Sequence, residues 1–230
     1  EIQVLGDSHG NVVHLGERDC STQRRHQKLI EEAPSPVIDD DIRRQLGEAA
    51  VGLARRVNYQ GAGTVEFVFD AQTRRFYFLE MNTRIQVEHT ITEAVTGVDL
   101  VREQVRVAAG EPLSVTQDAV SPRGHAFECR INAEDASQRF LPTPGLITGY
   151  REPSGPGVRV DSGVRAGSVI PEIYDPMVAK LIVWDVDRET ARRRMLRALD
   201  EYVVEGPPTL IPFHRWLLQE PEFIAGGACH

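Results

Sequence analysis

Five polar side chains occupy every second position in the segment 80–88, directly after the apolar run 76–79. In an extended chain alternate side chains point the same way, so all five would share one face of a strand. That face would carry two carboxylates, an amide oxygen and a guanidinium, which is too polar for an ordinary core. The residues are Glu80, Asn82, Arg84, Gln86 and Glu88.

A further carboxylate, Glu66, lies on the strand that is predicted just before this segment. A five-residue turn at 71–75 would pair Asp70 with Phe76 and Glu66 with Glu80. The two glutamates would then lie directly opposite each other on one face of the hairpin, where like charges are destabilising.

Opposed carboxylates are tolerated when one is protonated or when a cation lies between them. Glu66 and Glu80, together with the amide of Asn82, suit a hard cation such as Mg²⁺ or Mn²⁺, with phosphate oxygens completing its shell. A solvated strand face with the register displaced by one residue explains the same spacing without a metal. Spacing alone leaves both interpretations open.

Positive side chains are concentrated in the segment 17–28. A run of this kind is usually a solvated basic loop, and composition favours that interpretation. The alternative is an anion site for phosphate or bicarbonate, in which His26 and Lys28 share a face if the segment is extended. The basic residues are Arg18, Arg24, Arg25, His26 and Lys28.

Helices and strands that would position these residues can be predicted from local signals. Capping carboxylates and apolar periodicity predict a helix over 40–58, capped by Asp39 or Asp40, and a helix over 188–202, capped by Asp187. A third helical stretch is predicted over 92–109, interrupted near Gly97. The opening residues predict a β-hairpin around a turn rich in Asp, Ser, Gly and Asn.

A polar stretch at 113–123 is a plausible boundary between two domains. After it, period-two alternation returns over 125–132, and Arg130 is the side chain there that could do chemistry. The simplest alternative for Arg130 is a surface ion pair with Glu128 or Glu134.

Composition excludes several classes of protein. The net charge of −8, with no long basic run, argues against nucleic-acid binding. Cys20, Cys129 and Cys229 are odd in number and far apart, which favours a reducing compartment over a disulfide framework. No stretch is apolar for the length of a membrane span, so we expect a cytoplasmic protein with no membrane partner.

The run 80–89, Glu-Met-Asn-Thr-Arg-Ile-Gln-Val-Glu-His, resembles the signature of biotin carboxylases, which are ATP-grasp enzymes. Further matches extend across nearly all 230 residues. The family's first half, with its glycine-rich phosphate loop and two nucleotide-contacting lysines, has no counterpart here. We therefore expect a piece of a longer protein that binds ATP poorly by itself. The other matching segments are 17–28, 31–34, 61–64, 96–100 and 125–135.

The resemblance implies an α+β fold with two parts. Residues 1–113 would form the C-terminal part of an ATP-grasp domain, an antiparallel sheet with helices. Residues 124–230 would form a biotin carboxylase C-terminal domain.

The resemblance also assigns a role to each candidate residue near bicarbonate. Glu88 would be the catalytic base that takes the proton of bicarbonate. Arg84 would bind bicarbonate through its guanidinium, as a further catalytic residue. Lys28 and the backbone at Gln86 and Val87 would complete the bicarbonate-binding site.

Separate residues would bind the nucleotide, the metal and biotin. Glu66, Glu80 and Asn82 would hold Mg²⁺ or Mn²⁺, and the two glutamates would thereby contact ATP. Gln23 and His26 resemble the family's nucleotide contacts. The third catalytic residue, Arg130, would bind biotin and stabilise the charge on its ureido oxygen.

The implied activity is ATP-dependent carboxylation of biotin attached to a carrier. Bicarbonate and ATP would give carboxyphosphate, which supplies CO₂ to N1 of biotin. Partners would be a biotin carboxyl carrier protein or domain, a carboxyltransferase and a second copy of the chain, with Arg159 at the interface. We expect an acetyl-CoA or propionyl-CoA carboxylase of fatty acid biosynthesis, although pyruvate and urea are other possible acceptors.

Three other classes of function stay open, and one of them, a simple anion-binding domain, explains the basic segment but not the opposed carboxylates. An ATP-grasp ligase of the carbamoyl phosphate synthetase type shares the Glu-Met-Asn run, but not the stretch that follows residue 124. A non-catalytic module for dimerisation or carrier docking would use only the C-terminal part. Metal-dependent ATP turnover separates that module from an enzyme.

Overall fold

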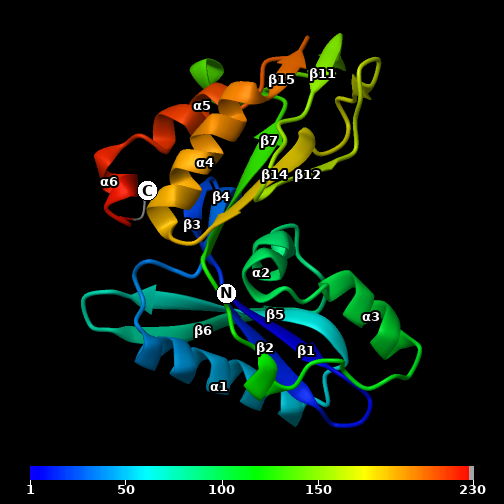
Figure 1. The fold of residues 1–230 in the computed structure, drawn as a ribbon, viewed down its shortest axis with the longest axis vertical. Coiled ribbons are helices and arrows are strands. Elements are labelled where there is room, and N and C mark those ends of the chain that lie inside the picture. Colours follow the sequence, from blue (N-terminus) through cyan, green and yellow to red (C-terminus); the bar gives the residue numbers. More distant parts are fainter. Residues whose placement is uncertain (228–230) are drawn as a thin grey trace. The chain divides into compact units, whose positions relative to one another are not determined.

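The computed structural model describes residues 1–227, and Cys229 lies outside them. The chain divides into two compact units. The first contains Glu1–Cys20 and Glu32–Gly124, and the second contains Ser21–Glu31 and the chain from His125 onward. Both units combine antiparallel strands with helices, so the predicted α+β class is confirmed (Figure 1).

The first unit is built on a four-stranded antiparallel sheet in the order β2-β1-β5-β6. Its first two strands form the hairpin that the opening residues predict. The strands are β1 (Ile2–Gly6), β2 (Val12–Glu17), β5 (Gly61–Asp70) and β6 (Arg75–Asn82).

Helices cover both faces of this sheet, with α1 on one side and α2 and α3 on the other (Figure 1). Side chains of β1 alternate accordingly, since Ile2 and Val4 pack with Ile42 of α1 and Leu5 packs with Leu100 of α3. This two-sided packing explains why every residue of β1 is buried. The helices are α1 (Asp40–Arg56), α2 (His89–Thr96) and α3 (Leu100–Ala108), with a 3₁₀ turn at Gln117–Ala119.

The β5–β6 hairpin confirms one part of the predicted register and corrects the other. Glu66 lies opposite Glu80, as predicted, but Asp70 pairs with Arg75 and not with Phe76. The two observations are compatible because a bulge makes Leu79 an extra residue on β6. A bulge cannot be read from alternation alone, so the turn is one residue shorter than predicted.

The prediction of one continuous polar face over 80–88 is wrong beyond Asn82, where β6 ends. The chain then bends and enters α2 at His89. Arg84 is exposed, whereas Gln86 is 4% and Glu88 2% exposed. The later polar residues therefore reach their positions through a loop, in which Gln86 and Glu88 are buried, and not through strand alternation.

The second unit is built on a five-stranded sheet in the order β12-β14-β7-β4-β3. Its β3 and β4 come from the basic segment, which is a β-hairpin and not the solvated loop that composition favours. The strands are β3 (Asp19–Arg24), β4 (Gln27–Ala33), β7 (His125–Asn132), β12 (Val158–Ser162) and β14 (Met177–Asp185).

One face of this sheet is packed against helices. Phe127, Cys129 and Ile131 of β7 join Met195 and Leu199 of α4 in the core. No helix within residues 1–227 has the length and apolar character needed to cross a lipid bilayer. The helices are α4 (Arg188–Glu201), which is capped by Asp187 as predicted, α5 (Ile211–Leu217) and α6 (Pro221–Ile224).

Short strands and one 3₁₀ turn complete the second unit. The strands form three two-stranded sheets, in which β8 pairs with β9, β10 with β13 and β11 with β15. Their bounds are β8 (Glu134–Asp135), β9 (Leu141–Pro142), β10 (Gly145–Leu146), β13 (Val169–Ile170), β11 (Gly149–Arg151) and β15 (Val203–Glu205), and the 3₁₀ turn is Ala136–Gln138.

Candidate active site

The carboxylates of Glu66 and Glu80 lie on the same face of the β5–β6 hairpin, joined by Asn82. The Nδ2 of Asn82 donates to Glu66 Oε1 at 3.0 Å and to Glu80 Oε1 at 3.1 Å. A single amide thus bridges both acids, which reduces the repulsion between them. The three side chains that were expected to hold a metal therefore meet at one place.

Two residues of the loop after β6 extend this cluster. Arg84 donates from one terminal nitrogen to Asn82 Oδ1 at 3.0 Å and from the other to the carbonyl of Ile85 at 3.2 Å. Gln86 donates from Nε2 to Glu66 Oε1 at 2.9 Å. The loop therefore brings a guanidinium and a second amide to the paired carboxylates, although it is not a strand.

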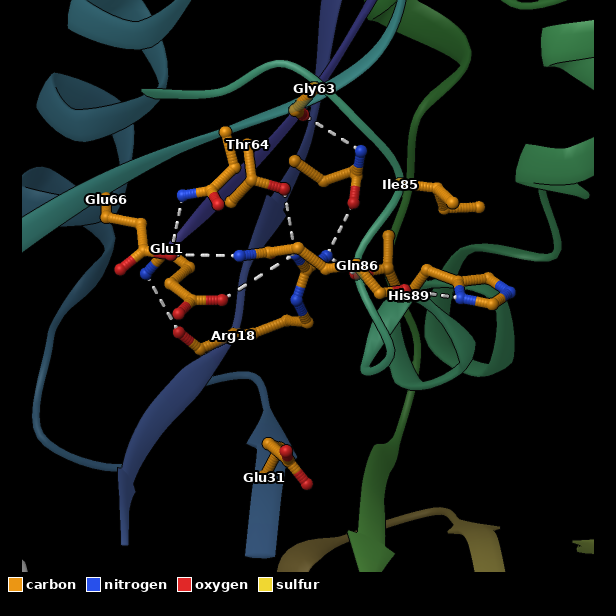
Figure 2. A network of polar contacts seen from close by, with 12 residues as sticks. Glu1, Arg18, Glu31, Gly63, Thr64, Glu66, Ile85, Gln86 and His89 are labelled. Atoms are coloured by element: carbon orange, nitrogen blue, oxygen red, sulfur yellow. Dashed lines mark hydrogen bonds and ion pairs between the residues drawn. The ribbon is translucent and has the colours of Figure 1, made fainter. Parts of the chain in front are cut away.

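Gln86 also contacts Arg18, a fully buried arginine (Figure 2). Its terminal nitrogens donate to Gln86 Oε1 at 2.5 Å, Gln3 Oε1 at 2.6 Å, Thr92 Oγ1 at 2.9 Å and Thr64 Oγ1 at 3.1 Å. These acceptors come from β1, β5, α2 and the loop. Arg18 is therefore not part of a solvated basic segment, because acceptors distant in sequence satisfy its charge in the interior.

Glu88 occupies the N-cap position of α2, but its side chain makes no capping hydrogen bond. It lies beside Glu1 and Cys20, and one carboxylate or thiol atom of each is within 4.8 Å of the others. Glu1 Oε2 is 3.8 Å from an Arg18 nitrogen. The sequence did not predict this cluster, since its members are far apart in the chain.

The other predicted residues lie in the second unit. Gln23 and His26 are exposed on the β3–β4 hairpin, and Lys28 is half-buried on β4. His26 has φ 65° and lies in the turn, so it does not alternate with Lys28 along one strand as an extended segment would require. The hairpin keeps Gln23 and His26 accessible to a ligand.

Arg130, on β7, forms an ion pair with Glu31 of the neighbouring strand β4. The Nε of Arg130 lies 2.6 Å from Glu31 Oε1, and the side chains are 18% and 0% exposed respectively. The partner is neither Glu128 nor Glu134, which the sequence suggests, but a residue 99 positions away in the chain. A buried carboxylate of this kind holds the guanidinium in one orientation while part of it stays accessible.

His214 of α5 supports the same strand from the core. Its Nε2 donates to the backbone carbonyl of Arg130 at 2.8 Å. Burial lowers the pKa of His214 from 6.5 to about 4, because a buried imidazolium loses its hydration. The imidazole is therefore neutral near pH 7 and acts as a hydrogen-bond donor.

Comparisons with protein families match both units. A model described as the ATP binding domain of the carbamoyl-phosphate synthase L chain matches residues 1–116. A model described as the biotin carboxylase C-terminal domain matches residues 128–229.

Individual relatives agree with these models. A biotin carboxylase of Nostoc is 58% identical over 99% of this chain and 51% of its own length. One of the subunits of the Methanothermobacter thermautotrophicus pyruvate carboxylase is 58% identical over 98% of this chain and 46% of its own. The chain thus spans about half the length of these relatives.

A solved structure is similar throughout the chain. It is the biotin carboxylase domain dimer of Hydrogenobacter thermophilus 2-oxoglutarate carboxylase, in complex with MgADP, ADP and bicarbonate. The two share 47% identity and a TM-score of 0.96, over 98% of this chain and 49% of that one.

Proposed function

This chain belongs to the biotin carboxylase family of ATP-grasp enzymes, and on that premise we propose that it takes part in the ATP- and bicarbonate-dependent carboxylation of carrier-bound biotin. The observation that carries the proposal is the joined set of Glu66, Glu80 and Asn82. Two opposed carboxylates repel each other, and a cation bound between them removes this repulsion. The same cation can bind the phosphates of a nucleotide.

The donor set fits a divalent cation. Glu66 and Glu80 offer carboxylate oxygens, which Mg²⁺ and Mn²⁺ prefer. Asn82 turns its Nδ2 toward the carboxylates and its Oδ1 toward Arg84, and a half-turn of the amide would present the oxygen instead. A bound cation neutralises charge on the phosphate oxygens of ATP.

Glu88 is the proposed base for bicarbonate. It takes the proton of bicarbonate, so that an oxygen of the resulting dianion attacks the γ-phosphorus while the bond to ADP breaks. Arg84 is exposed and presents its guanidinium beside Asn82, where it would hold the bicarbonate oxygens. Lys28 and the backbone of Gln86 and Val87 complete the proposed bicarbonate site. The product is carboxyphosphate.

Biotin is the proposed partner of Arg130. Carboxyphosphate breaks into CO₂ and phosphate, the released phosphate takes the proton from N1 of biotin, and the N1 electron pair forms the bond to the carbon of CO₂. The negative charge that develops on the ureido oxygen is stabilised by Arg130. Its ion pair with Glu31 supports this role because it orients the guanidinium in advance. Gln23 and His26, both exposed, are proposed as nucleotide contacts.

The proposed setting is a multi-component carboxylase in the cytoplasm. The carrier and the carboxyltransferase are proposed partners, and the proposed domains are residues 1–113 and 124–230. Acetyl-CoA or propionyl-CoA is our proposed acceptor, within fatty acid biosynthesis. The names of the relatives include pyruvate and 2-oxoglutarate carboxylases, so the acceptor has to be measured directly.

The second candidate, a ligase of the carbamoyl phosphate synthetase type, is favoured only by the description of the model that matches residues 1–116. The match of residues 128–229 to the biotin carboxylase C-terminal domain favours biotin as the substrate. A non-catalytic module would not require the paired carboxylates.

A chimeric enzyme tests the proposal. The matching part of the Nostoc biotin carboxylase is replaced by this chain, which is 58% identical to it. We expect bicarbonate-dependent ATP cleavage and carboxylation of free biotin, both lost in a Glu80→Gln variant. A folded chimera that performs neither reaction would contradict the proposed function.

A further inference from the structure

The charge of Arg18 is satisfied in the interior mainly by neutral groups, and the carboxylate of Glu1 lies 3.8 Å from one of its nitrogens. Each terminal nitrogen donates to two uncharged acceptors: one to Gln3 and Thr92, the other to Thr64 and Gln86. Burying a guanidinium is costly, so such an arrangement needs good hydrogen-bond geometry on all sides. The hydrogen bonds of Arg18 therefore fix the orientation of the four acceptor side chains.

The hydrogen bond from Arg18 fixes which end of the Gln86 amide faces Arg18 and which end faces Glu66. A guanidinium only donates hydrogen bonds, whereas a side-chain amide has one accepting end and one donating end. Arg18 therefore selects the rotamer in which Gln86 Oε1 points toward it, at 2.5 Å. The opposite end, Nε2, is then directed at Glu66 Oε1, 2.9 Å away. In the flipped amide, two donors would face each other at Arg18 and two acceptors at Glu66.

Glu66 thus receives two donors on one oxygen, Nε2 of Gln86 and Nδ2 of Asn82. Asn82 would have to turn its amide to ligate a cation, as described above, and this turn removes its hydrogen bond to Glu66. Gln86 does not have to move, so it can keep Glu66 oriented before and after a cation binds. Figure 2 shows Arg18, Gln86 and Glu66 in one network, in which Gln86 contacts both of the others.

From this geometry we infer that Arg18 and Gln86 are positioning residues, a buried relay that orients the Glu66 carboxylate for the divalent cation. The inference rests on the proposed function, because it assumes that Glu66 is a metal ligand. Partners that orient metal ligands typically contribute about 10- to 100-fold to metal affinity. Neither Arg18 nor Gln86 needs to touch the cation.

Metal binding by the 230-residue chain itself tests the relay. Mn²⁺ is titrated into the chain, and free Mn²⁺ is followed by electron paramagnetic resonance, which needs no catalytic turnover. Gln86→Met keeps the side-chain length but removes both ends of the amide, and we expect about 10- to 100-fold weaker Mn²⁺ binding.

Thr92→Val is the matched control. It also removes one acceptor of Arg18, but Thr92 does not lead on to Glu66. A purely structural role of the Arg18 cluster would change Mn²⁺ affinity in both variants, whereas the relay changes it only in Gln86→Met. Equal Mn²⁺ affinities of Gln86→Met and the unchanged chain would overturn the inference.

Arg18→Lys tests the other end of the relay. A single ammonium cannot satisfy four acceptors, so Mn²⁺ binding should weaken, and the double variant with Gln86→Met should bind as weakly as Gln86→Met alone. Additive losses would show that Arg18 acts by another route and overturn the relay. If circular dichroism shows that Arg18→Lys is unfolded, the comparison of Mn²⁺ affinity between Gln86→Met and Thr92→Val still tests the relay.

Glu66→Gln separates the inference from the proposed function. If the unchanged chain binds no Mn²⁺, or binds it equally well after Glu66→Gln, the proposed metal site is wrong and the relay falls with it. If Glu66→Gln abolishes binding while Gln86→Met leaves it intact, only the relay is wrong.

Discussion

At the scale of single residues, Glu88 and Arg130 are proposed to serve different steps of one reaction. Glu88→Gln should lower bicarbonate-dependent ATP cleavage by about 10²- to 10⁴-fold, because the nucleophile is never deprotonated. Arg130→Gln should lower biotin carboxylation by about 10²- to 10³-fold and ATP cleavage much less, because carboxyphosphate can still form and decompose. Both rates are measured in parallel in the chimeric enzyme.

The two variants act as controls for each other. Equal losses of ATP cleavage and carboxylation in Arg130→Gln would contradict the division of labour. Intact ATP cleavage in Glu88→Gln would show that another group deprotonates bicarbonate.

A second prediction at this scale concerns pH and His214. Its pKa is 6.5 when exposed and about 4 in the fold, so the unfolded chain binds more protons between these values. The free energy of unfolding should therefore fall as the pH drops through this window, by about 1.4 kcal/mol per pH unit at most. Above pH 6.5 the contribution of His214 is constant.

His214→Gln provides the comparison, because its amide can donate to the same carbonyl of Arg130 but does not titrate. Urea unfolding at pH 7 and pH 5 gives the loss of unfolding free energy between these pH values for each protein. The variant should lose less stability than the unchanged chain, and identical losses would show that His214 is not buried in its neutral form.

At the scale of elements, α1 contains two glycines in opposite environments. A Cβ at Gly52 meets no atom within 4 Å, whereas a Cβ at Gly47 would lie 2.5 Å from the imidazole of His14 on β2. Gly52→Ala should raise the free energy of unfolding by about 1 kcal/mol through helix propensity. Gly47→Ala should lower it, since overpacking typically costs about 1–3 kcal/mol.

Denaturant unfolding of both variants measures the difference. Both variants replace glycine by alanine in the same helix, so the helix-propensity contribution cancels in the difference between their free energies of unfolding. The difference then reports the contact of residue 47 with His14 on β2. Equal stabilisation by both substitutions would show that α1 does not approach β2 as closely as the structure has it.

At the scale of the whole molecule, the proposed homodimer can be tested at the edge strand β12. Arg159 donates there to the carboxylate of Asp161 at 2.7 and 2.8 Å, and an edge strand is open to further contacts. Sedimentation at micromolar concentration should show a dimer. Arg159→Glu should shift it toward the monomer, because it places a like charge beside Asp161.

Arg165→Glu makes the same charge change at another exposed arginine of this unit and should leave the dimer intact. A monomer in the unchanged chain, or equal dissociation in both variants, would contradict an interface at Arg159.

Local signals in the sequence were sufficient for much of the fold. The helix caps Asp39 and Asp187 and the opposition of Glu66 to Glu80 were predicted correctly. Each depends on residues a few positions apart or on strand alternation across one short turn. The resemblance of the run 80–89 then identified the family, which the comparisons confirm.

Only the tertiary structure decided how the polar residues after Asn82 are used. Strand alternation ends there, so the hydrogen bond of Gln86 to Glu66 could not be derived from spacing. The burial of Arg18 and its pairing with Gln86 were equally hidden, because a charge enters the interior only when distant strands and helices supply its acceptors. The sequence by itself determined which chemical groups this protein has and where its helices and hairpins begin. Their burial and orientation depend on contacts between segments far apart in the chain, which only the folded units contain.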